Sequence, residues 1–357
     1  MSIPSPLVLP ELDIVVAAGQ SNATAAHSLP DTVEDEDIDP RIHQWNGSAI
    51  VPMRPAPSHQ NIGTAFAQEY VKQLKPDRGV LVVNCGRGTS GFSTVSVSRI
   101  PPEGPKYLYH VNPRVGTWDP ALGRAFGINH YNEMIAGVQT ALGAAPSGSR
   151  IIAVLWSAGE ADYPMTRSEY EAKLDDMIGA ARAAWHSPTL RWLIGSQNPD
   201  WLDAQGPERH AIEAALADTP RRVERTAYCW GPENLPEPGV TVHWSPQGQR
   251  TRGRIFLRGW ELARLNVTGA APQPPQNPRA WRSGTAVYVT WEHPPSRFDS
   301  FTLEYRVNGG AWTELVLAEG SARAAVISDV EPKDAVGIRL RTTNSLGDSV
   351  NTREICA

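Results

Sequence analysis

Two short segments of this chain hold residues that could take part in acyl transfer from an ester. Ser21 lies in LDIVVAAGQSN, residues 12–22, where an apolar run ends at Gly19 and polar residues follow. Residues 85–90, CGRGTS, form a glycine-rich turn directly after a second apolar run. A serine hydroxyl can attack an ester carbonyl, and a glycine-rich turn lets backbone N–H groups approach the oxyanion that develops. Ser21 is therefore the first candidate nucleophile.

The surrounding segments predict the elements that would position these residues. Buried strands are expected from the apolar runs, which cover 12–19, 79–84, 151–156, 190–196 and 225–229. Helices are expected where apolar residues recur at helical spacing, over 61–74, the second half of 112–142, 167–185, 206–216 and 246–265. Alternating strands and helices with right-handed crossovers predict a three-layer α/β/α sandwich around a parallel sheet. Ligands of such sheets bind at the carboxyl ends of the strands, where Ser21 lies.

The polar segment 27–53 is expected to be a long loop over the top of the sheet. Its acidic run, Glu34 to Asp39, is expected to be a solvated face without chemistry. His43, Gln44 and Trp45 either line a pocket rim or belong to a surface loop anchored by the tryptophan, and the sequence leaves both alternatives open.

Three blocks, in order along residues 10–265, resemble motifs of the SGNH hydrolases, in the branch of the sialate O-acetylesterases and carbohydrate acetylesterases. Residues 19–22 are similar to its Gly-Gln-Ser-Asn block, and 87–90 to its Gly-Gly-Thr-Ser turn, with Arg87 in place of the first glycine. Residues 156–162, WSAGEAD, resemble its Trp-His-Gln-Gly-Glu-Ser-Asp block. His243 stands just before the final predicted helix, where the family has its catalytic histidine in an Asp-x-x-His pattern.

The resemblance implies a role for each of these residues. Ser21 would be the nucleophile and His243 the base, while the N–H groups of Ser21 and Gly88 would bind the oxyanion. Gln20, Asn22 and Thr89 would complete the oxyanion and substrate-binding set. Serine-type acyl transfer needs no cofactor, so neither a cofactor nor a metal is expected.

Two departures from the family pattern affect this reaction. Val240 occupies the position of the family's acid, and Ala158 replaces a side-chain amide that helps to hold the oxyanion. Losing a triad acid can cost about 10⁴ in rate, and losing one oxyanion donor about 10²–10³. Glu160, Asp162, Glu237 or a backbone carbonyl could orient His243 instead, and the sequence does not choose among them.

We therefore predict a carbohydrate O-acetylesterase that acts on an acetylated carbohydrate or a cell-surface polysaccharide. The substrate class follows from the resemblance, because nothing in the residues alone selects acetyl over another small acyl group. The alternative hypothesis is a catalytically degenerate protein of the same fold that binds glycans or has a structural role, for example a phage virion or fibre component that recognises host polysaccharide.

The composition changes at Gly269, where GAAPQPPQNP reads as a stiff proline-rich linker. We predict an α/β domain over 1–268, a linker over 269–278 and an all-β sandwich over 279–357. Runs such as VYVTW and LEYRV alternate apolar and polar residues, which is typical of a small antiparallel sandwich. This region resembles a fibronectin type III domain, although Val336 replaces the usual corner tyrosine. It would serve as a spacer, a sugar-binding module or a docking site for an assembly partner.

Composition argues against several other classes. The 357 residues carry a net charge of −5, which gives no general reason to bind nucleic acid. Cys85, Cys229 and Cys356 lie far apart and predict isolated buried thiols rather than disulfides or a zinc site. No apolar stretch approaches the ~20 residues of a membrane span. The N-terminal residues lack the pattern of a secretory signal, so we expect synthesis in the cytoplasm, followed by incorporation into a virion or by release through another route.

Overall fold

The first part of the chain folds around a seven-stranded sheet. The computed structural model describes residues 9–24, 37–53, 61–94, 106–109, 111, 118–119, 124–125, 127–294, 296–317 and 322–357. The strand order is β11-β10-β9-β1-β4-β2-β3, and neighbouring strands are parallel except for β2 and β3. The strands are β1 (Glu11–Gly19), β2 (Ile42–Trp45), β3 (Ile50–Pro52), β4 (Arg78–Gly86), β9 (Arg150–Ser157), β10 (Arg191–Gly195) and β11 (Thr226–Cys229).

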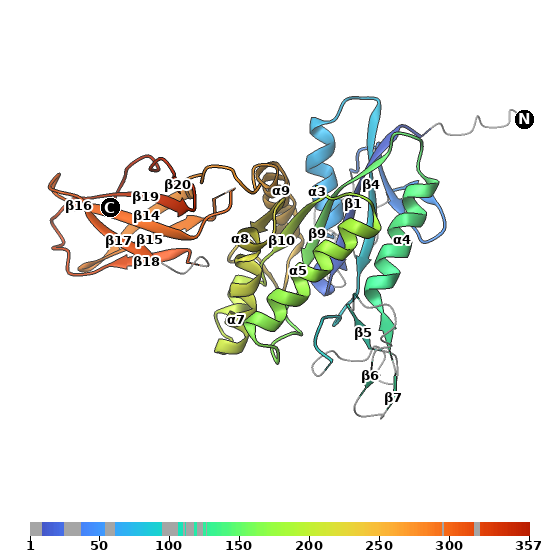
Figure 1. The fold of residues 1–357 in the computed structure, drawn as a ribbon, viewed down its shortest axis with the longest axis horizontal. Helices are drawn as coiled ribbons and strands as arrows, with labels where there is room; N and C mark the ends of the chain where they lie inside the picture. Colours follow the sequence, from blue (N-terminus) through green and yellow to red (C-terminus); the bar gives the residue numbers. More distant parts are fainter. Residues whose placement is uncertain are drawn as a thin grey trace, which may run out of the picture.

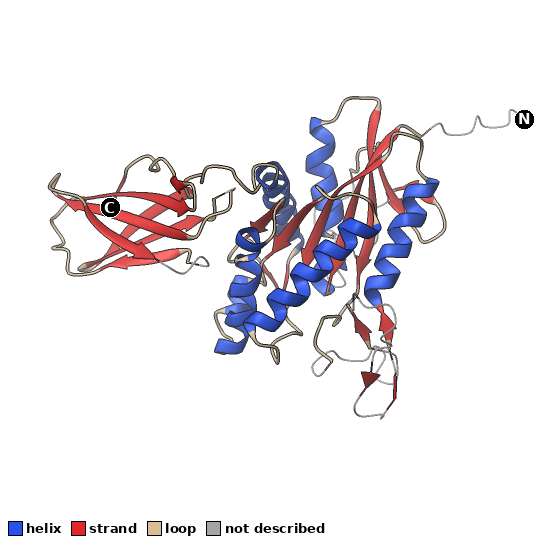
Figure 2. Ribbon diagram, in the orientation of Figure 1, coloured by secondary structure: helices blue, strands red, loops and turns tan. Residues whose placement is uncertain are grey.

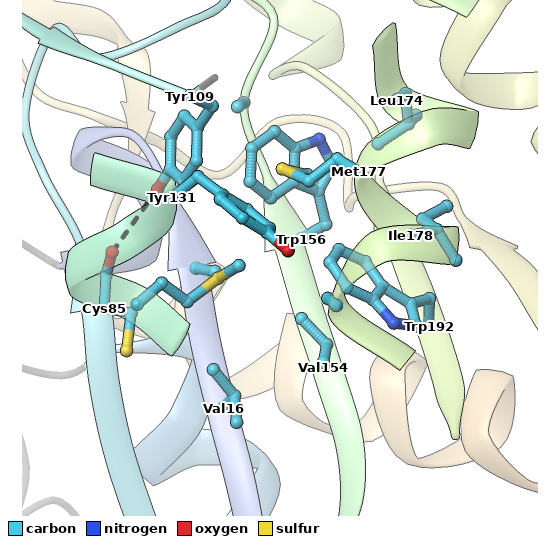
Figure 3. Close-up of a cluster of buried hydrophobic side chains, with 14 of the residues drawn as sticks. Val16, Cys85, Tyr109, Tyr131, Val154, Trp156, Leu174, Met177, Ile178 and Trp192 are labelled. Atoms are coloured by element: carbon cyan, nitrogen blue, oxygen red, sulfur yellow. Dashed lines mark hydrogen bonds between the residues drawn. The ribbon is translucent and has the colours of Figure 1, made fainter. Parts of the chain in front are cut away.

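Helices cover both faces of this sheet (Figures 1 and 2). One face packs against α3 (Ile62–Tyr70) and α9 (Pro246–Ala263), and the other against α4 (His130–Ala144), α5 (Arg167–Ala184) and α7 (Pro207–Ala217). Strand β1 supplies both cores, because its side chains alternate: Val16 belongs to the core under α4 and α5, and Val15 to the core under α3 and α9. Figure 3 shows the first core, where Trp156 and Trp192 pack beside Met177. The predicted three-layer α/β/α sandwich is confirmed.

Segment 37–53 differs from its prediction as a loop. Strand β2 pairs in parallel with β4, and β3 adds an antiparallel edge strand. His43 is buried, and its Nδ1 lies 3.1 Å from the carbonyl oxygen of Arg41. Asp39, from the acidic run, pairs with Arg41 at 2.7 Å, whereas residues 34–36 of that run lie outside the described residues. These strands escaped prediction because each has only three or four residues and much of β2 and β3 is polar or half exposed.

The remaining elements of this part are short. They are α1 (Ser21–Thr24), the 3-10 turn η1 (Val71–Gln73), β5 (Tyr107–Leu108), β6 (Trp118–Asp119), β7 (Arg124–Ala125), β8 (Ile128–Asn129), α6 (Pro199–Leu202), α8 (Thr219–Arg222), β12 (Pro236–Glu237) and β13 (Val240–Trp244). Strands β12 and β13 form an antiparallel hairpin outside the main sheet.

The C-terminal part is a sandwich of two antiparallel sheets, as the alternating pattern predicts. One sheet has the order β14-β15-β18, and the other has β17-β16-β19-β20, with β21 also paired to β19. The strands are β14 (Gln276–Ser283), β15 (Ala286–Glu292), β16 (Ser300–Val307), β17 (Thr313–Leu317), β18 (Ala324–Ile327), β19 (Val336–Asn344), β20 (Gly347–Asp348) and β21 (Ile355–Cys356). Trp291, Phe301 and Leu340 lie in the core between the sheets.

Arginines of the sandwich contact the α/β part of the chain. Arg297 donates from Nη2 to the carbonyl oxygen of Arg221 at 2.6 Å, and the guanidinium of Arg323 lies 4.1 Å from the ring centre of Trp230. All three cysteines are free, but only Cys85 and Cys229 are buried. The prediction of a buried thiol is wrong for Cys356, because side chains alternate along β21: Ile355 packs against the sandwich core and Cys356 lies on the exposed side. Across the described ranges, no helix has the length and apolar character that crossing a membrane requires.

Candidate active site

The candidate residues meet at the carboxyl edge of the sheet, where β1, β4 and β9 end together. Gly19, the last residue of β1, pairs with Gly86 on one side and with Ser157 on the other. Gly19 has φ +123°, and a Cβ there would collide with the carbonyl oxygen of Ser157. Only glycine fits this conformation and this close approach, so the chain can turn sharply from β1 into α1.

Ser21 is the first residue of α1, and His243 lies within reach of its hydroxyl. The distance from His243 Nε2 to Ser21 Oγ is 2.8 Å, a hydrogen bond between residues 222 positions apart. Ser21 is half-buried, and the side chain of His243 is 13% exposed, so the pair is open to solvent on one side. This is the geometry of a hydroxyl with a base in position to take its proton.

Two local features place His243. The residue lies on β13, and its carbonyl oxygen accepts a hydrogen bond from Asn198 Nδ2 at 3.0 Å. Ser245 then caps α9: its side chain accepts from the backbone N–H of Gly248, and Pro246 occupies the first turn, where a missing N–H costs nothing. His243 is thus held between a short strand and a capped helix, in the predicted position before the last helix of this part.

The carboxylate that the structure brings to His243 is that of Glu237. Its Oε2 lies 3.6 Å from His243 Nδ1, the ring nitrogen that does not face Ser21. Glu237 pairs with Val240 across the β12–β13 hairpin, whose turn contains Gly239 at φ +78°. The contact is longer than an ordinary hydrogen bond of about 2.7–3.2 Å and lies within the range of an ion pair.

Glu160 and Asp162, the other carboxylates considered, make different contacts. Glu160 Oε1 accepts a hydrogen bond from Asn22 Nδ2 at 2.7 Å. Asp162 Oδ1 accepts from the backbone N–H groups of Phe92 and Ser93, each at 2.8 Å. Both side chains are buried, and burial raises the pKa of Glu160 and that of Asp162, the latter to about 7. Glu160 therefore holds the residue after Ser21, and Asp162 holds the backbone of residues 92 and 93.

Gln20 and Asn22 flank Ser21 and tie α1 to neighbouring segments. Gln20 Oε1 accepts from the backbone N–H of Gly159 at 2.9 Å. Asn22 Nδ2 donates to Glu160 and also to the carbonyl oxygen of Val242 at 3.0 Å. Both side chains are at least 95% buried. Gln20 and Asn22, the two predicted substrate-binding residues, thus use these hydrogen bonds to hold α1 against neighbouring segments of the protein.

The glycine-rich turn after β4 lies directly beside α1. The N–H of Arg87 donates to the carbonyl oxygen of Gly19 at 2.9 Å, and Thr89 has φ +55°. A Cβ on Gly86 would meet the side chains of Ala23 and Thr24. Gly88 lies in this turn, and its part as a backbone donor stays a prediction. Ala158, on the β9 side, is buried and offers no side-chain donor.

Sequence reasoning missed two of the residues that organise this edge. Asn198 holds the backbone of His243, and Arg252 donates to the carbonyl oxygen of Asn22 from inside the protein. It named Glu237 only as one of several alternatives. The segment PEPGVTVHW contains a Pro-Gly turn between short runs, which could have predicted the hairpin that carries Glu237.

Within the described part of the chain, no group of three or more His, Cys, Asp or Glu side chains could hold a metal ion.

Comparison with known proteins gives one family match and several structural matches. The model of the family "Carbohydrate esterase, sialic acid-specific acetylesterase" matches residues 11–259. The protein NanS shares 18% identity with a TM-score of 0.52, over 71% of this chain and 98% of its own. A protein from Arabidopsis thaliana shares 15% identity with a TM-score of 0.50, over the same 71% and 98%.

A third solved structure, a carbohydrate acetylesterase from Xanthomonas citri, shares 16% identity with a TM-score of 0.49, over 91% of this chain and 74% of its own. A search of proteins with curated functions found no match. At these identities NanS and the Arabidopsis protein show a common fold for the α/β part.

Proposed function

We propose a catalytic mechanism for this chain from the premise that it belongs to the carbohydrate esterase family of the sialic acid-specific acetylesterases. The chain is a carbohydrate O-acetylesterase, a serine ester hydrolase that releases acetate from an acetylated sugar. What the family does not provide is the set of residues that act here, since Val240 and Ala158 depart from the motifs described above. The mechanism below assigns those roles.

Ser21 is the nucleophile and His243 is the general base. The observation that carries this assignment is the 2.8 Å hydrogen bond between Ser21 Oγ and His243 Nε2. The oxygen of Ser21 attacks the acetyl carbonyl carbon while its proton passes to His243 Nε2. The protonated ring then gives this proton to the departing sugar oxygen, and the acetyl group stays on Ser21 as an ester. Water, deprotonated by the same ring, attacks the acetyl carbon; the bond to Ser21 Oγ breaks, the ring returns the proton to that oxygen, and acetate leaves.

Glu237 orients the histidine. Its carboxylate lies on the Nδ1 side of the ring, so it can accept a hydrogen bond from the Nδ1–H group and stabilise the imidazolium that forms in each step. In the family pattern the acid stands three residues before the histidine, at the position of Val240. Here the acid comes from the residue that faces Val240 across the hairpin. The hairpin register shifts between Pro236 and Glu237, and in this irregular hairpin the Glu237 carboxylate is the one that lies 3.6 Å from the histidine ring.

Backbone N–H groups of Ser21 and Gly88 bind the oxyanion. Gly88 follows β4 in the turn that packs on α1, and Ser21 begins that helix. Two such donors aimed at the developing charge are the usual requirement for acyl transfer. Ala158 contributes no amide, so the site works with one donor fewer than the family motif contains.

The substrate is an O-acetylated sugar, and we assign it to the sialic acids on the strength of the family description.

The test of the mechanism is acetate release from O-acetylated sialic acid and from a neutral aryl acetate, measured for the unaltered chain, Ser21→Ala and His243→Ala. Ser168→Ala, on the exposed first turn of α5, is the matched control and should behave as the unaltered chain. Turnover lost in both site variants supports the mechanism, and turnover that survives either change overturns it.

A further inference from the structure

Arg252 is a buried cation directly behind the candidate active site. It lies on α9, which packs over β10 and β11, and only 1% of its surface is exposed. Burying an arginine is costly unless its donors are satisfied, and burial lowers the pKa of this side chain to about 9. The nearby carboxylate of Glu160 opposes that shift. The contacts of Arg252 show what compensates for its burial.

Those contacts reach both halves of the reacting pair. Nη1 donates to the carbonyl oxygen of Asn22 at 3.1 Å, and Asn22 follows the nucleophile in α1. The guanidinium carbon lies 3.8 Å from the ring centre of Trp244, which follows His243 in β13. Arg252 therefore touches the residue after Ser21 and the residue after His243 at the same time.

A third contact fixes the guanidinium against the sheet. Nη2 donates to Ser157 Oγ at 2.7 Å, at the end of β9, and Nη1 also donates to Gln249 Oε1 at 3.1 Å. Ser157 pairs with Gly19 across the sheet, so this bond holds the guanidinium against the edge from which Ser21 departs. The related motif has histidine where this chain has Ser157, and the small hydroxyl here is an acceptor for Arg252.

We propose that Arg252 is a positioning residue that holds α1 and β13 in register, so that Ser21 Oγ stays within hydrogen-bond distance of His243 Nε2. The proposal rests on the mechanism given above. The planar fork is essential, because two nitrogens bond in different directions while the flat face stacks on Trp244. A lysine would keep the positive charge but offers a point charge without the fork or the flat face.

The effect belongs in the catalytic step rather than in substrate binding. Arg252 is 1% exposed and lies beneath α1, out of reach of a sugar bound at the surface, so its loss should displace the reacting atoms without removing a contact to the sugar. A displacement of about 1 Å can cost about 10² in rate. We expect kcat to fall about 10- to 100-fold in Arg252→Lys, with KM changed by less than about threefold.

The experiment measures kcat and KM for an aryl acetate with Arg252→Lys, Arg252→Ala, Ser157→Ala and a control. The control is Arg254→Ala, which removes an arginine 62% exposed at its side chain on the same helix and should leave both constants unchanged. Added guanidinium at non-denaturing concentration should restore part of kcat in Arg252→Ala, because it can enter the space that the side chain leaves. It should restore nothing in Ser21→Ala.

Each outcome decides the proposal. Full kcat in Arg252→Lys, or a loss that falls on KM alone, would overturn it. If Arg252→Ala does not fold, Ser157→Ala and Arg252→Lys still test it, since each removes part of the contact set; unchanged kcat in both would reject it. If the Ser21→Ala variant keeps the turnover of the unaltered chain, the proposed mechanism is overturned instead. In that case no residue is needed to position Ser21.

Discussion

Glu237 faces Val240 across the β12–β13 hairpin, and this pairing brings a carboxylate oxygen to within 3.6 Å of His243 Nδ1. Val240 is 41% exposed and stands three residues before His243, at the place of the acid in the Asp-x-x-His pattern. In the proposed mechanism, β12 supplies the carboxylate that the family motif places on the same strand as the histidine. Val240 is the departure from the motif that affects catalysis most, and Glu237, its partner across the hairpin, can compensate for it.

Replacing Glu237 by glutamine should lower kcat about 10²- to 10⁴-fold, because the amide cannot stabilise the imidazolium of His243 as a carboxylate does. The measurement is acetate release under saturating aryl acetate. Glu233→Gln is the matched control, since Glu233 lies in the segment just before β12 and is exposed. Equal rates for the two variants would remove Glu237 from the mechanism.

Moving the acid back to the family position should restore activity. In the double variant Glu237→Gln with Val240→Asp, the new carboxyl group is placed at the pairing partner of residue 237 across the hairpin. We expect kcat to recover at least about tenfold over Glu237→Gln alone, as the lost charge stabilisation is regained. Val240→Lys in the same background is the control, and recovery there would show that the side chain at 240 acts in some other way.

Asn22→Asp should impair catalysis and stability together. Asn22 Nδ2 donates to Glu160 Oε1 and to the carbonyl oxygen of Val242, so aspartate would lose both donated bonds and place a second carboxyl group against a buried one. We expect kcat to fall about 10²-fold, because α1 and β13 would separate, and the midpoint of thermal unfolding to fall as well. Asn46→Asp, at an exposed turn where the side chain accepts its hydrogen bonds, should change neither.

Stability should decrease as the pH rises through the acidic and neutral range, in part because of Asp162. Burial raises the pKa of this carboxyl group to about 7 in the folded chain, whereas an aspartate in the unfolded chain ionises near pH ~4. Between these values the folded state retains a proton that the unfolded state has lost, so the free energy of unfolding falls with rising pH. Its contribution is complete below pH ~4 and is lost as the pH passes about 7.

The measurement is urea unfolding at several pH values from the acidic to the neutral range. Asp162→Asn keeps an acceptor for the N–H groups of Phe92 and Ser93 but cannot ionise, so its free energy of unfolding should fall less steeply with pH. Glu213 titrates in the same window, because burial raises its pKa to about 7 as well, so Glu213→Gln should act in the same direction. Asp176→Asn, at an exposed position, should keep the slope of the unaltered chain, and the same slope in Asp162→Asn would refute the assignment.

Much of the α/β part could be predicted because its strands are long and buried on both faces. Residues 12–18 are fully buried, and their apolar run alone marks a central strand. Strands β2 and β3 gave no such signal, because each has only three or four residues and β2 carries the polar side chains of His43 and Gln44, so neither period is visible. The pairing of Ser21 with His243 followed from motif order, since both lie at ends of predicted elements.

The orienting acid could not be predicted because it depends on a contact between two-residue and five-residue strands that form no part of the main sheet. Spacing alone left Glu160, Asp162 and Glu237 equivalent, and only the hairpin geometry separates them. Arg252 escaped notice because a charged residue on an amphipathic helix is normally taken to face solvent. The boundaries at 268 and 278, and the cellular location, stay predictions.

The most direct test of the central claim is to identify the nucleophile by covalent labelling. An aryl phosphonofluoridate reacts with an activated serine: the Ser21 oxygen forms a bond to phosphorus, fluoride departs, and the proton passes to the base. Mass spectrometry of the labelled chain should show one adduct, mapped to the peptide that contains Ser21. Labelling should be absent in Ser21→Ala and much slower in His243→Ala. An adduct on another residue, or acetate release that continues in Ser21→Ala, would contradict the account.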